Sequence, residues 1–496
     1  MKKITLFFLV LCLLAAMSPW SLTAGATALN EPAETTQPAP EPTAPDVQSS
    51  QVSQGNASVS HGAATLDGQK PLGGNEKRLE TAKAALLYEL NTGTLLYSWN
   101  PDARMHPASL VKVVTVMMAL EEGKLSDSVT ITSAMLAQLR DGDLFTDFKE
   151  GEQITLGDLI HSTMLSSSNA ASALIAIHIS GSEAAFVSKM NARVRELGCK
   201  DTNFVNSHGI PVDNQYTTAR DTARIVAAAL ESETFRQVFG TTEYTIPATS
   251  VSEARELKTT NYFMSTRSVQ KFFDNRVTGG KSGAASTQDR SIVFTAESGE
   301  LNLLGVVMGA EGKTEADGYS LKHHGNFEEA TVLMNYGFDS FTTAQILFSG
   351  KSLAQFSVEG GANDIVGRPV SSAFSALPAH TGVDNLSWQY VLDESLEAPV
   401  EKDQVIGAIQ VWCGDICVAQ SEMVSMNRAE LREASSGDEV LDEEESSGIT
   451  RFLLIVGIVV GAVMVLGALA VLALWLRGAV ARSRRRRRRQ SRRRSR

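Results

Sequence analysis

The stretch HPASLVKVVT, residues 106–115, places Ser109 three residues before Lys112 and surrounds both with small or apolar side chains. The residues that follow are apolar at helical spacing, which predicts a helix beginning just after Pro107. Ser109 then lies in the first turn and Lys112 projects from the same face, so the hydroxyl and the amine can touch. A serine becomes a nucleophile when a base takes its proton, and a lysine can be that base when burial lowers its pKa. Taken alone, the stretch fits equally well a helix with a serine cap and a surface lysine.

Two later stretches carry further polar groups. MLSSSNAASALI places Ser167 and Asn169 in a polar break between predicted helices, giving a hydroxyl that can relay a proton and an amide that can hold a substrate carbonyl. VTGGKSGAAS places Lys281, Ser282 and Gly283 on a predicted strand. The first two can bind an anionic group there, and the glycine lets another backbone come close. Singly, these stretches are typical of a loop with a helix cap and of a strand entry.

Together and in this order, S-x-x-K, S-x-N and K-[ST]-G form the active-serine signature of penicillin-binding proteins and class A β-lactamases. The chain resembles the secreted D-alanyl-D-alanine carboxypeptidases, low-molecular-mass penicillin-binding proteins of serine peptidase family S11. The similarity includes PASLVKVVT, MLSSSNAASALI, NSHGIPVDNQYTTARDTARI and GVVMGA. It implies an α/β (α+β) penicillin-binding/β-lactamase-like transpeptidase fold, followed by a small all-β domain and a C-terminal transmembrane helix.

The resemblance also implies the acyl-transfer chemistry. Ser109 would attack the penultimate D-alanine carbonyl of a peptidoglycan stem pentapeptide, with Lys112 as its base, and Ser167 would pass the proton toward the leaving amine. The backbone N–H groups of Ser109 and Ala284 would form the oxyanion hole, which stabilises charge that develops in the transition state. Water would then hydrolyse the acyl-enzyme, and neither a metal nor another cofactor is expected.

Substrate recognition follows from the same resemblance. Asn169 would align the peptide, while Lys281 and Ser282 would bind the terminal carboxylate beside Gly283. β-Lactam antibiotics, which mimic the D-alanyl-D-alanine end, are the expected covalent inhibitors.

The third motif departs from the family pattern. Ser282 replaces the usual threonine, and Ala284 and Ala285 stand where an aromatic residue or histidine and then a threonine are usual. KSGA is similar to class A β-lactamases, but their deacylating glutamate is expected before the third motif, and residues 202–220 contain no glutamate. Two alternatives stay open: a class A-like β-lactamase, and a non-catalytic membrane-tethered peptidoglycan- or penicillin-binding protein.

The ends of the chain differ from its middle. Residues 1–26 combine two lysines, a short apolar run and small residues, as a secretory signal does. Residues 451–476 are uncharged after Arg451 and long enough to span a bilayer with tilt. The 12 arginines of residues 477–496 predict a cytoplasmic C-terminus and attraction to anionic lipids, with the catalytic domain outside the bacterial cell membrane. No aromatic residue is interleaved with them for base stacking, so nucleic-acid binding is not expected.

Composition and periodicity predict seven segments. The catalytic part begins with two strands, AALLYEL and TLLYSW, and continues with helical patterns, whereas the part after it alternates as short strands do. The segments are a signal peptide (1–26), a disordered Pro/Ser/Thr-rich linker (27–79), the catalytic domain (80–345), a β-rich domain (346–430), an acidic stalk (431–450), the transmembrane helix (451–476) and the Arg-rich tail (477–496).

The cysteines and histidines give weaker signals. Cys413 and Cys417 flank an apparent hairpin turn and can form a disulfide outside the cell or stay reduced. Cys199 follows a helix stop and is expected to be buried. His208, in NSHGIP, is expected to be a loop or packing residue rather than a catalyst, and no His-x-His or His-Glu-x-x-His zinc motif is present.

Overall fold

The structure is a computed structural model that describes residues 66, 68–74, 76, 78–139, 148–266, 270–315, 321–393 and 396–433. The predicted signal peptide, membrane helix and arginine tail lie outside these residues, as does most of the predicted linker and stalk.

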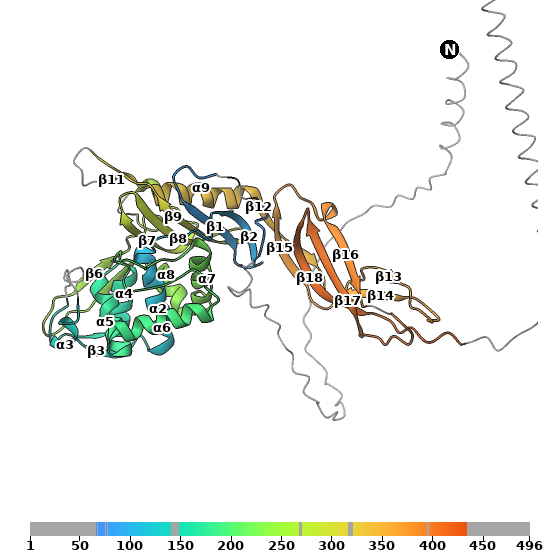
Figure 1. Cartoon of the computed structure of the whole chain (residues 1–496), viewed down its shortest axis with the longest axis horizontal. Coiled ribbons are helices and arrows are strands. Elements are labelled where there is room, and N and C mark those ends of the chain that lie inside the picture. The colour runs from blue at the N-terminus through green and yellow to red at the C-terminus, as the bar shows by residue number, and fades with distance from the viewer. Residues whose placement is uncertain are drawn as a thin grey trace, which may run out of the picture. The chain divides into compact units, whose positions relative to one another are not determined.

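A five-stranded antiparallel sheet organises the first part of the chain (Figure 1). Its strands lie in the order β2-β1-β9-β8-β7, so β1 is paired with β2 on one side and with β9, from far along the chain, on the other. The bounds are Ala84–Glu89 (β1), Thr94–Trp99 (β2), Val277–Ser286 (β7), Asp289–Ser298 (β8) and Leu301–Ala310 (β9).

The two faces of this sheet pack against different helices. All six residues of β1 are buried: Leu86 and Tyr88 belong to one apolar core, and Ala85 and Leu87 belong to a second. Side chains alternate between the faces of a strand, so a strand without exposed residues indicates a sheet that is covered on both sides. Helix α9 (Gly325–Ser340) covers one face, and the remaining long helices gather on the other (Figure 1).

The predicted helices of the catalytic part are confirmed. They include α4 (Leu156–Met164), α5 (Asn169–Ser180) and α6 (Glu183–Glu196), with α3 (Ser133–Leu136), α7 (Ala219–Ala229) and α8 (Glu233–Gly240) around them. Helix α6 stops before Gly198, whose φ is 83°, as a helix-terminating glycine requires. Two-residue to four-residue strands form small ribbons beside these helices: β3 (Ser128–Thr130) with β4 (Gln153–Thr155), β5 (Glu243–Ile246) with β6 (Arg255–Lys258), and β10 (Lys313–Thr314) with β11 (Leu321–His323).

Helix α2 (Val111–Glu122) runs through the centre of the helical layer. Its first nine residues are all buried, including Lys112, which is 0% exposed. A helix that is apolar around its whole circumference has to be enclosed by other elements, and α2 contacts α4, α5 and α7. The lysine of the first motif is therefore held inside the protein rather than on its surface.

The second part of the chain is all β and begins at Phe341, where β12 follows α9 directly. One sheet has the order β13-β14-β18-β17-β16 and a second pairs β12 with β15. The predicted boundary between residues 345 and 346 falls within β12. The bounds are Phe341–Leu347 (β12), Gln355–Phe356 (β13), Ile365–Pro369 (β14), Ala373–Pro378 (β15), Ser387–Leu392 (β16), Val405–Cys413 (β17) and Ile416–Ser425 (β18).

Cys413 and Cys417 were expected either to form a disulfide or to stay reduced, and the pairing of β17 with β18 distinguishes these two states. Cys413 pairs with Ile416, whereas Cys417 pairs with Trp412. Residues paired across a ladder share one face, and successive residues alternate, so the two thiols lie on opposite faces. Both are free in the structure, and Cys199 is free and buried as predicted.

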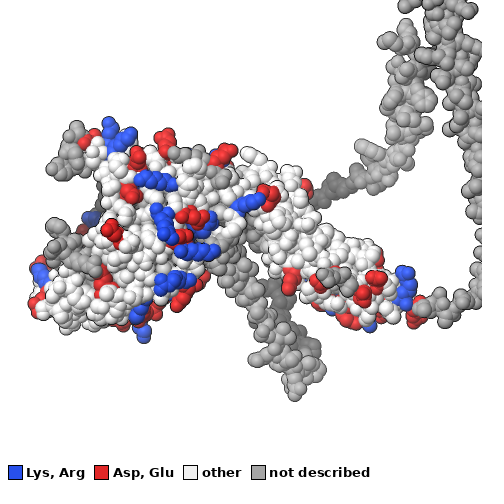
Figure 2. Space-filling model, viewed as in Figure 1, with Lys and Arg blue, Asp and Glu red and all other residues white. Residues whose placement is uncertain are grey.

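The catalytic part carries charges of both signs on its surface. Acidic and basic side chains are interspersed on the face of the catalytic part seen in Figure 2. Within the described residues, no single helix has the length and apolarity to cross a membrane, and only α5 and α6, bent by 86°, pass that test as a pair.

Candidate active site

The nucleophile of the first motif lies in a tight turn at the start of α2. Ser109 is the middle residue of a 3-10 turn, Ala108–Leu110, and is partly exposed. Ala108 before it has a φ of 49°, a left-handed conformation that is uncommon for a residue other than glycine.

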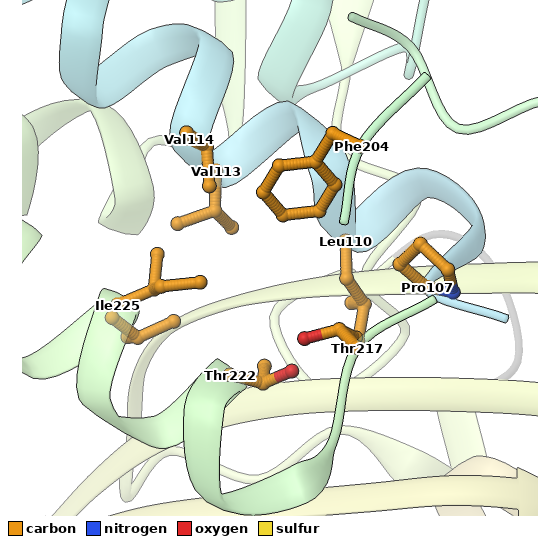
Figure 3. A pocket seen from close by; sticks show the side chains of 9 residues that line it. Pro107, Leu110, Val113, Val114, Phe204, Thr217, Thr222 and Ile225 are labelled. Atoms are coloured by element: carbon orange, nitrogen blue, oxygen red, sulfur yellow. The ribbon is translucent and has the colours of Figure 1, made fainter. Parts of the chain in front are cut away.

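Behind the turn is an apolar cavity of about 10 Å³, lined by Leu110, Val113 and Phe204 among others (Figure 3). It holds at most one water-sized sphere, so it is a packing gap rather than a ligand site.

The Lys112 amine contacts three acceptors from different elements. Its Nζ lies 3.4 Å from the Ser109 Oγ, donates to the Asn169 Oδ1 at 2.7 Å, and donates to the backbone carbonyl of His208. Lys112 is completely buried, so these polar groups take the place of water around the amine. The predicted contact between the serine and the lysine is confirmed.

The second motif lies in the break between α4 and α5, as predicted. Ser168 caps α5 by accepting a hydrogen bond from the Ala171 N–H, and Asn169 is the first residue of that helix. Ser167 has a φ of 56°, so the chain turns sharply there and the hydroxyl is brought toward the sheet. The side chains of Ser167 and Asn169 reach different lysines: the amide accepts from Lys112, and the hydroxyl accepts from the Lys281 Nζ at 3.0 Å.

The third motif lies on the edge strand β7, as predicted. Lys281 is 1% exposed, and its Nζ also donates to the Ser282 carbonyl at 3.0 Å. A Cβ atom added to Gly283 would lie 2.8 Å from the Ser109 backbone nitrogen, so only glycine lets the strand approach the nucleophile turn this closely. Ala284, the other residue predicted to lend an N–H to the oxyanion hole, comes next on the strand and is exposed.

The structure therefore brings all three motifs together, although the first and third are far apart in the sequence. Two buried amines lie on either side of the helix break, one on α2 and one on β7. The Ser109 hydroxyl faces the first amine, and the turn that carries it is in contact with the strand of the second.

Burial lowers the pKa of the Lys281 amine to about 7. Desolvation is the cause, because the charged form of an amine loses its water inside a protein and is disfavoured there. A negatively charged ligand at this position would restore the preference for the charged form.

One contact of the site was not predicted from the sequence. The loop that contains His208 supplies a backbone carbonyl to Lys112, and the imidazole itself is 2% exposed with its Nδ1 accepting from the Ile210 N–H at 3.2 Å. His208 is thus a packing residue, as expected, while its main chain contacts the amine. Gly209 after it has a φ of 92°, so a glycine in the sequence could have indicated a tight turn here, but not which atom the turn contacts.

Comparison with known proteins agrees with this arrangement. Residues 74–312 match the family model for D-alanyl-D-alanine carboxypeptidase, Peptidase_S11, and residues 341–430 match the model for the penicillin-binding protein 5 C-terminal domain. The chain is 30% identical over 356 residues to D-alanyl-D-alanine carboxypeptidase DacA of Haemophilus influenzae, covering 70% of this chain and 85% of the relative. It is 28% identical to D-alanyl-D-alanine carboxypeptidase DacF of Bacillus subtilis over 66% of this chain and 80% of the relative.

The solved structure of penicillin binding protein 5 from Haemophilus influenzae superimposes with a TM-score of 0.56 at 28% sequence identity, covering 71% of this chain and 99% of that one. Both the catalytic fold and the all-β part after it are thus shared with solved relatives. The chain belongs to the D-alanyl-D-alanine carboxypeptidase family, Peptidase_S11.

Proposed function

We propose that this chain is a serine-type D-alanyl-D-alanine carboxypeptidase that removes the terminal D-Ala of peptidoglycan stem pentapeptides and so limits cross-linking of the cell wall. Family membership supports the reaction class. The observation that carries the assignment to residues is the buried Lys112 amine, 3.4 Å from the Ser109 hydroxyl. A hydroxyl next to an enclosed amine becomes a nucleophile when the amine is neutral and takes its proton.

In the proposed first step, Lys112 takes the proton of Ser109 while the oxygen attacks the carbonyl of the penultimate D-alanine. The oxyanion that forms is stabilised by the backbone N–H groups of Ser109 and Ala284, whose strand lies against the nucleophile turn. The C–N bond then breaks while the proton that Lys112 took is passed through Ser167 to the leaving amine, so that D-alanine departs and Lys112 is again neutral. In the second step, Lys112 takes a proton from the water that attacks the ester and returns it to the Ser109 oxygen as the shortened peptide leaves.

The terminal carboxylate is proposed to bind at Lys281 and Ser282. The Lys281 amine contacts the Ser167 hydroxyl at 3.0 Å, so binding of the anion and delivery of the proton take place at neighbouring atoms. Asn169 accepts from Lys112 and is proposed to donate from its amide NH₂ group to the substrate carbonyl. Ser282 provides the hydroxyl that threonine provides in most of the family.

The first test is to incubate the protein with a stem pentapeptide and to measure D-alanine release, with a Ser109→Ala variant as the control. Intact-mass analysis after incubation with penicillin is expected to show one adduct, on Ser109. An adduct on another residue, or none at millimolar drug, would overturn the assignment of the nucleophile.

The β-lactamase alternative predicts a different lifetime of the acyl-enzyme. Residues 202–220 contain no glutamate to activate the deacylating water, so we expect the penicilloyl adduct to persist for minutes or longer after free drug is removed. Rapid drug hydrolysis without D-alanine release would favour a β-lactamase. Slow clearance without D-alanine release would favour a tethered binding protein.

The ends of the chain support a proposal about location. A signal at residues 1–26 and a membrane helix at residues 451–476 would hold the catalytic part outside the cell membrane, with the Arg-rich tail on the cytoplasmic side against anionic lipids. Protease added to intact cells is expected to degrade the catalytic part and to spare an epitope placed after Arg496. Loss of the epitope with survival of the catalytic part would reverse the proposed orientation.

A further inference from the structure

Two consecutive carbonyls of the loop after α6 hold one face of the catalytic helix. The His208 carbonyl accepts from the Lys112 amine, and the Ser207 carbonyl accepts from the Thr115 hydroxyl at 2.6 Å. Residues 112 and 115 lie three apart on α2 and therefore share a face. The position of this short piece of main chain thus decides where the amine of Lys112 is held.

A buried carboxylate anchors the same piece of main chain from behind. Glu183, the first residue of α6, is 9% exposed and accepts from both the backbone N–H of Ser207, at 2.9 Å, and its hydroxyl, at 2.8 Å. The same Oε1 atom lies 3.5 Å from the His208 Nε2. An ionised acceptor makes stronger hydrogen bonds than a neutral one, and the N-terminus of a helix favours negative charge.

Helix α6 holds the loop at a second point. The Asn191 side chain forms a pair of hydrogen bonds, each of 2.8 Å, with the backbone N–H and carbonyl of Phe204. The Phe204 ring then faces Val113 and Leu110 of the catalytic helix across the small cavity (Figure 3). Helix α6 therefore holds the loop at two points, Phe204 and Ser207, on the side toward α2.

The loop also contacts the nucleophile turn directly. A Cβ atom added to Gly209 would lie 1.8 Å from the Ala108 carbonyl oxygen and 3.0 Å from the Ser109 backbone nitrogen. A displacement of residues 207–209 would consequently move both the partner of Lys112 and the support beneath Ser109. Misplacing reacting groups by about 1 Å lowers a rate by on the order of 10²-fold.

From these contacts we propose that Glu183 is a positioning residue for the acylation step. Its carboxylate fixes the Ser207–His208 peptide, and the His208 carbonyl in turn directs the Lys112 amine at the Ser109 hydroxyl. Glu183 touches neither substrate nor the reacting atoms. The inference rests on the proposed role of Lys112 as the base.

The chain offers a matched control in Glu329 on α9. It is 6% exposed and, like Glu183, accepts from one residue's hydroxyl and from backbone N–H groups: the Thr81 hydroxyl at 2.7 Å, the Thr81 N–H and the Glu80 N–H. It belongs to the opposite side of the sheet from the catalytic helix. Glu183→Ala and Glu329→Ala therefore remove the same kind of anchor, one beneath the site and one away from it.

The experiment measures acylation of the full chain by a fluorescent penicillin under pre-steady-state conditions, which separates the non-covalent affinity from the acylation rate constant. For Glu183→Ala we expect the rate constant to fall by on the order of 10²-fold, with the affinity unchanged, because the carboxylate site at Lys281 is not altered. Glu183→Gln keeps an oxygen acceptor and is expected to recover most of the rate. Glu329→Ala is expected to acylate within about twofold of the wild type, although its melting temperature falls as well.

Each other result overturns the proposal. Acylation by Glu183→Ala at the wild-type rate would show that the loop needs no anchor, and equal losses in the two alanine variants would show that Glu183 acts only through stability. If Glu183→Ala does not fold, Glu183→Gln remains informative: a folded glutamine variant that acylates as slowly as a variant without the Lys112 amine would contradict the proposal. A wild-type chain that penicillin fails to label would instead refute the proposed function itself.

Discussion

Lys112 and Lys281 are both buried amines of the same site, yet their surroundings differ. Lys112 lies on a helix, and its Nζ contacts a hydroxyl, a side-chain amide oxygen and a backbone carbonyl from three separate segments. Lys281 lies on an edge strand, and its Nζ contacts the Ser167 hydroxyl and the carbonyl of the next residue in its own strand. The Lys112 amine is fixed from several sides, whereas the Lys281 amine makes fewer contacts.

This difference separates two tasks that a lysine can perform. An amine that has to remove a proton from a particular oxygen must be held in one direction, and several acceptors do this. An amine that has to bind an anion is better left with few polar contacts from the protein. The bound anion then supplies the negative charge that stabilises the charged form of the amine. The expected effects of changing each lysine follow from this contrast.

The largest effect is expected for Lys112→Met. Methionine keeps the apolar packing of α2 but removes the base, so the rate of penicillin acylation should fall by at least about 10³-fold. Stopped-flow labelling measures the rate, and circular dichroism checks that the fold is retained. A folded variant that labels at the wild-type rate would show that Lys112 is not the base.

A smaller effect is expected from pH on the Lys281 side of the comparison. The pKa of the free amine is about 7, so it is charged below this pH and neutral above it. The non-covalent affinity for penicillin should therefore be constant below pH 7 and weaken by about tenfold per unit above it, until the higher pKa of the bound state is reached.

The control for this pH profile is a penicillin methyl ester, which lacks the carboxylate. Its affinity should change little between pH 6 and 9. Equal profiles for acid and ester would mean that Lys281 does not bind the carboxylate.

The burial of Lys281 should also make the free energy of unfolding depend on pH. The unfolded chain holds the Lys281 proton up to a pKa of about 10.5, and the folded chain holds it only up to about 7, so the unfolded state binds more protons between these values. The free energy of unfolding should rise with pH across this window, and the cost of burying Lys281 is greatest below pH 7. Lys281→Met should thus stabilise the protein by about 1–4 kcal/mol at pH 6, with a gain that shrinks as pH rises.

Urea unfolding at several pH values measures this gain, and the matched control is Lys124→Met, at an exposed position. A destabilised Lys281→Met variant at pH 6 would show that the amine is fully compensated in the folded protein. The control variant should stay within about 0.5 kcal/mol of the wild type at every pH.

The smallest effect is expected in the β domain, which contains neither lysine. Cys413 and Cys417 lie on opposite faces of their hairpin, so Cys417→Ser should change the free energy of unfolding by less than about 0.5 kcal/mol. Adding a reductant to the wild type should leave its melting temperature unchanged. A drop of several degrees would reveal a disulfide that the register does not permit.

The motifs and their local structures were predictable from the sequence because each depends on neighbours in the chain. Apolar spacing after Pro107 predicts α2, the polar break predicts the turn at Ser167, and the stretch VTGGKSGAAS is typical of a strand entry, as β7 is. The contact of β7 with the nucleophile turn was also anticipated, since Gly283 is the residue that permits it.

The pairing of partners across the site was not predictable in the same way. Ser167 contacts Lys281 and Asn169 contacts Lys112, and two residues so close in sequence reach different amines because the chain reverses between them. The carbonyl of His208 carries no signal in its side chain, so only the folded path of the loop reveals that it touches Lys112. Contacts made by main-chain atoms are invisible to a search for motifs.

The order of strands in the central sheet has a consequence for biosynthesis. β1 emerges near the start of the folded part, but its partner β9 emerges only after every helix around the site, since Ala85 pairs with Val307. β7, which touches the Ser109 turn, also leaves the ribosome only after α2 to α8. A chain crossing a membrane from its N-terminus would carry the serine and its lysine across long before the strand that completes their pocket. The chain would then become able to hydrolyse stem peptides only at a late step, when β7 and β9 have joined the sheet. A partly exported chain would be inactive toward the cell wall.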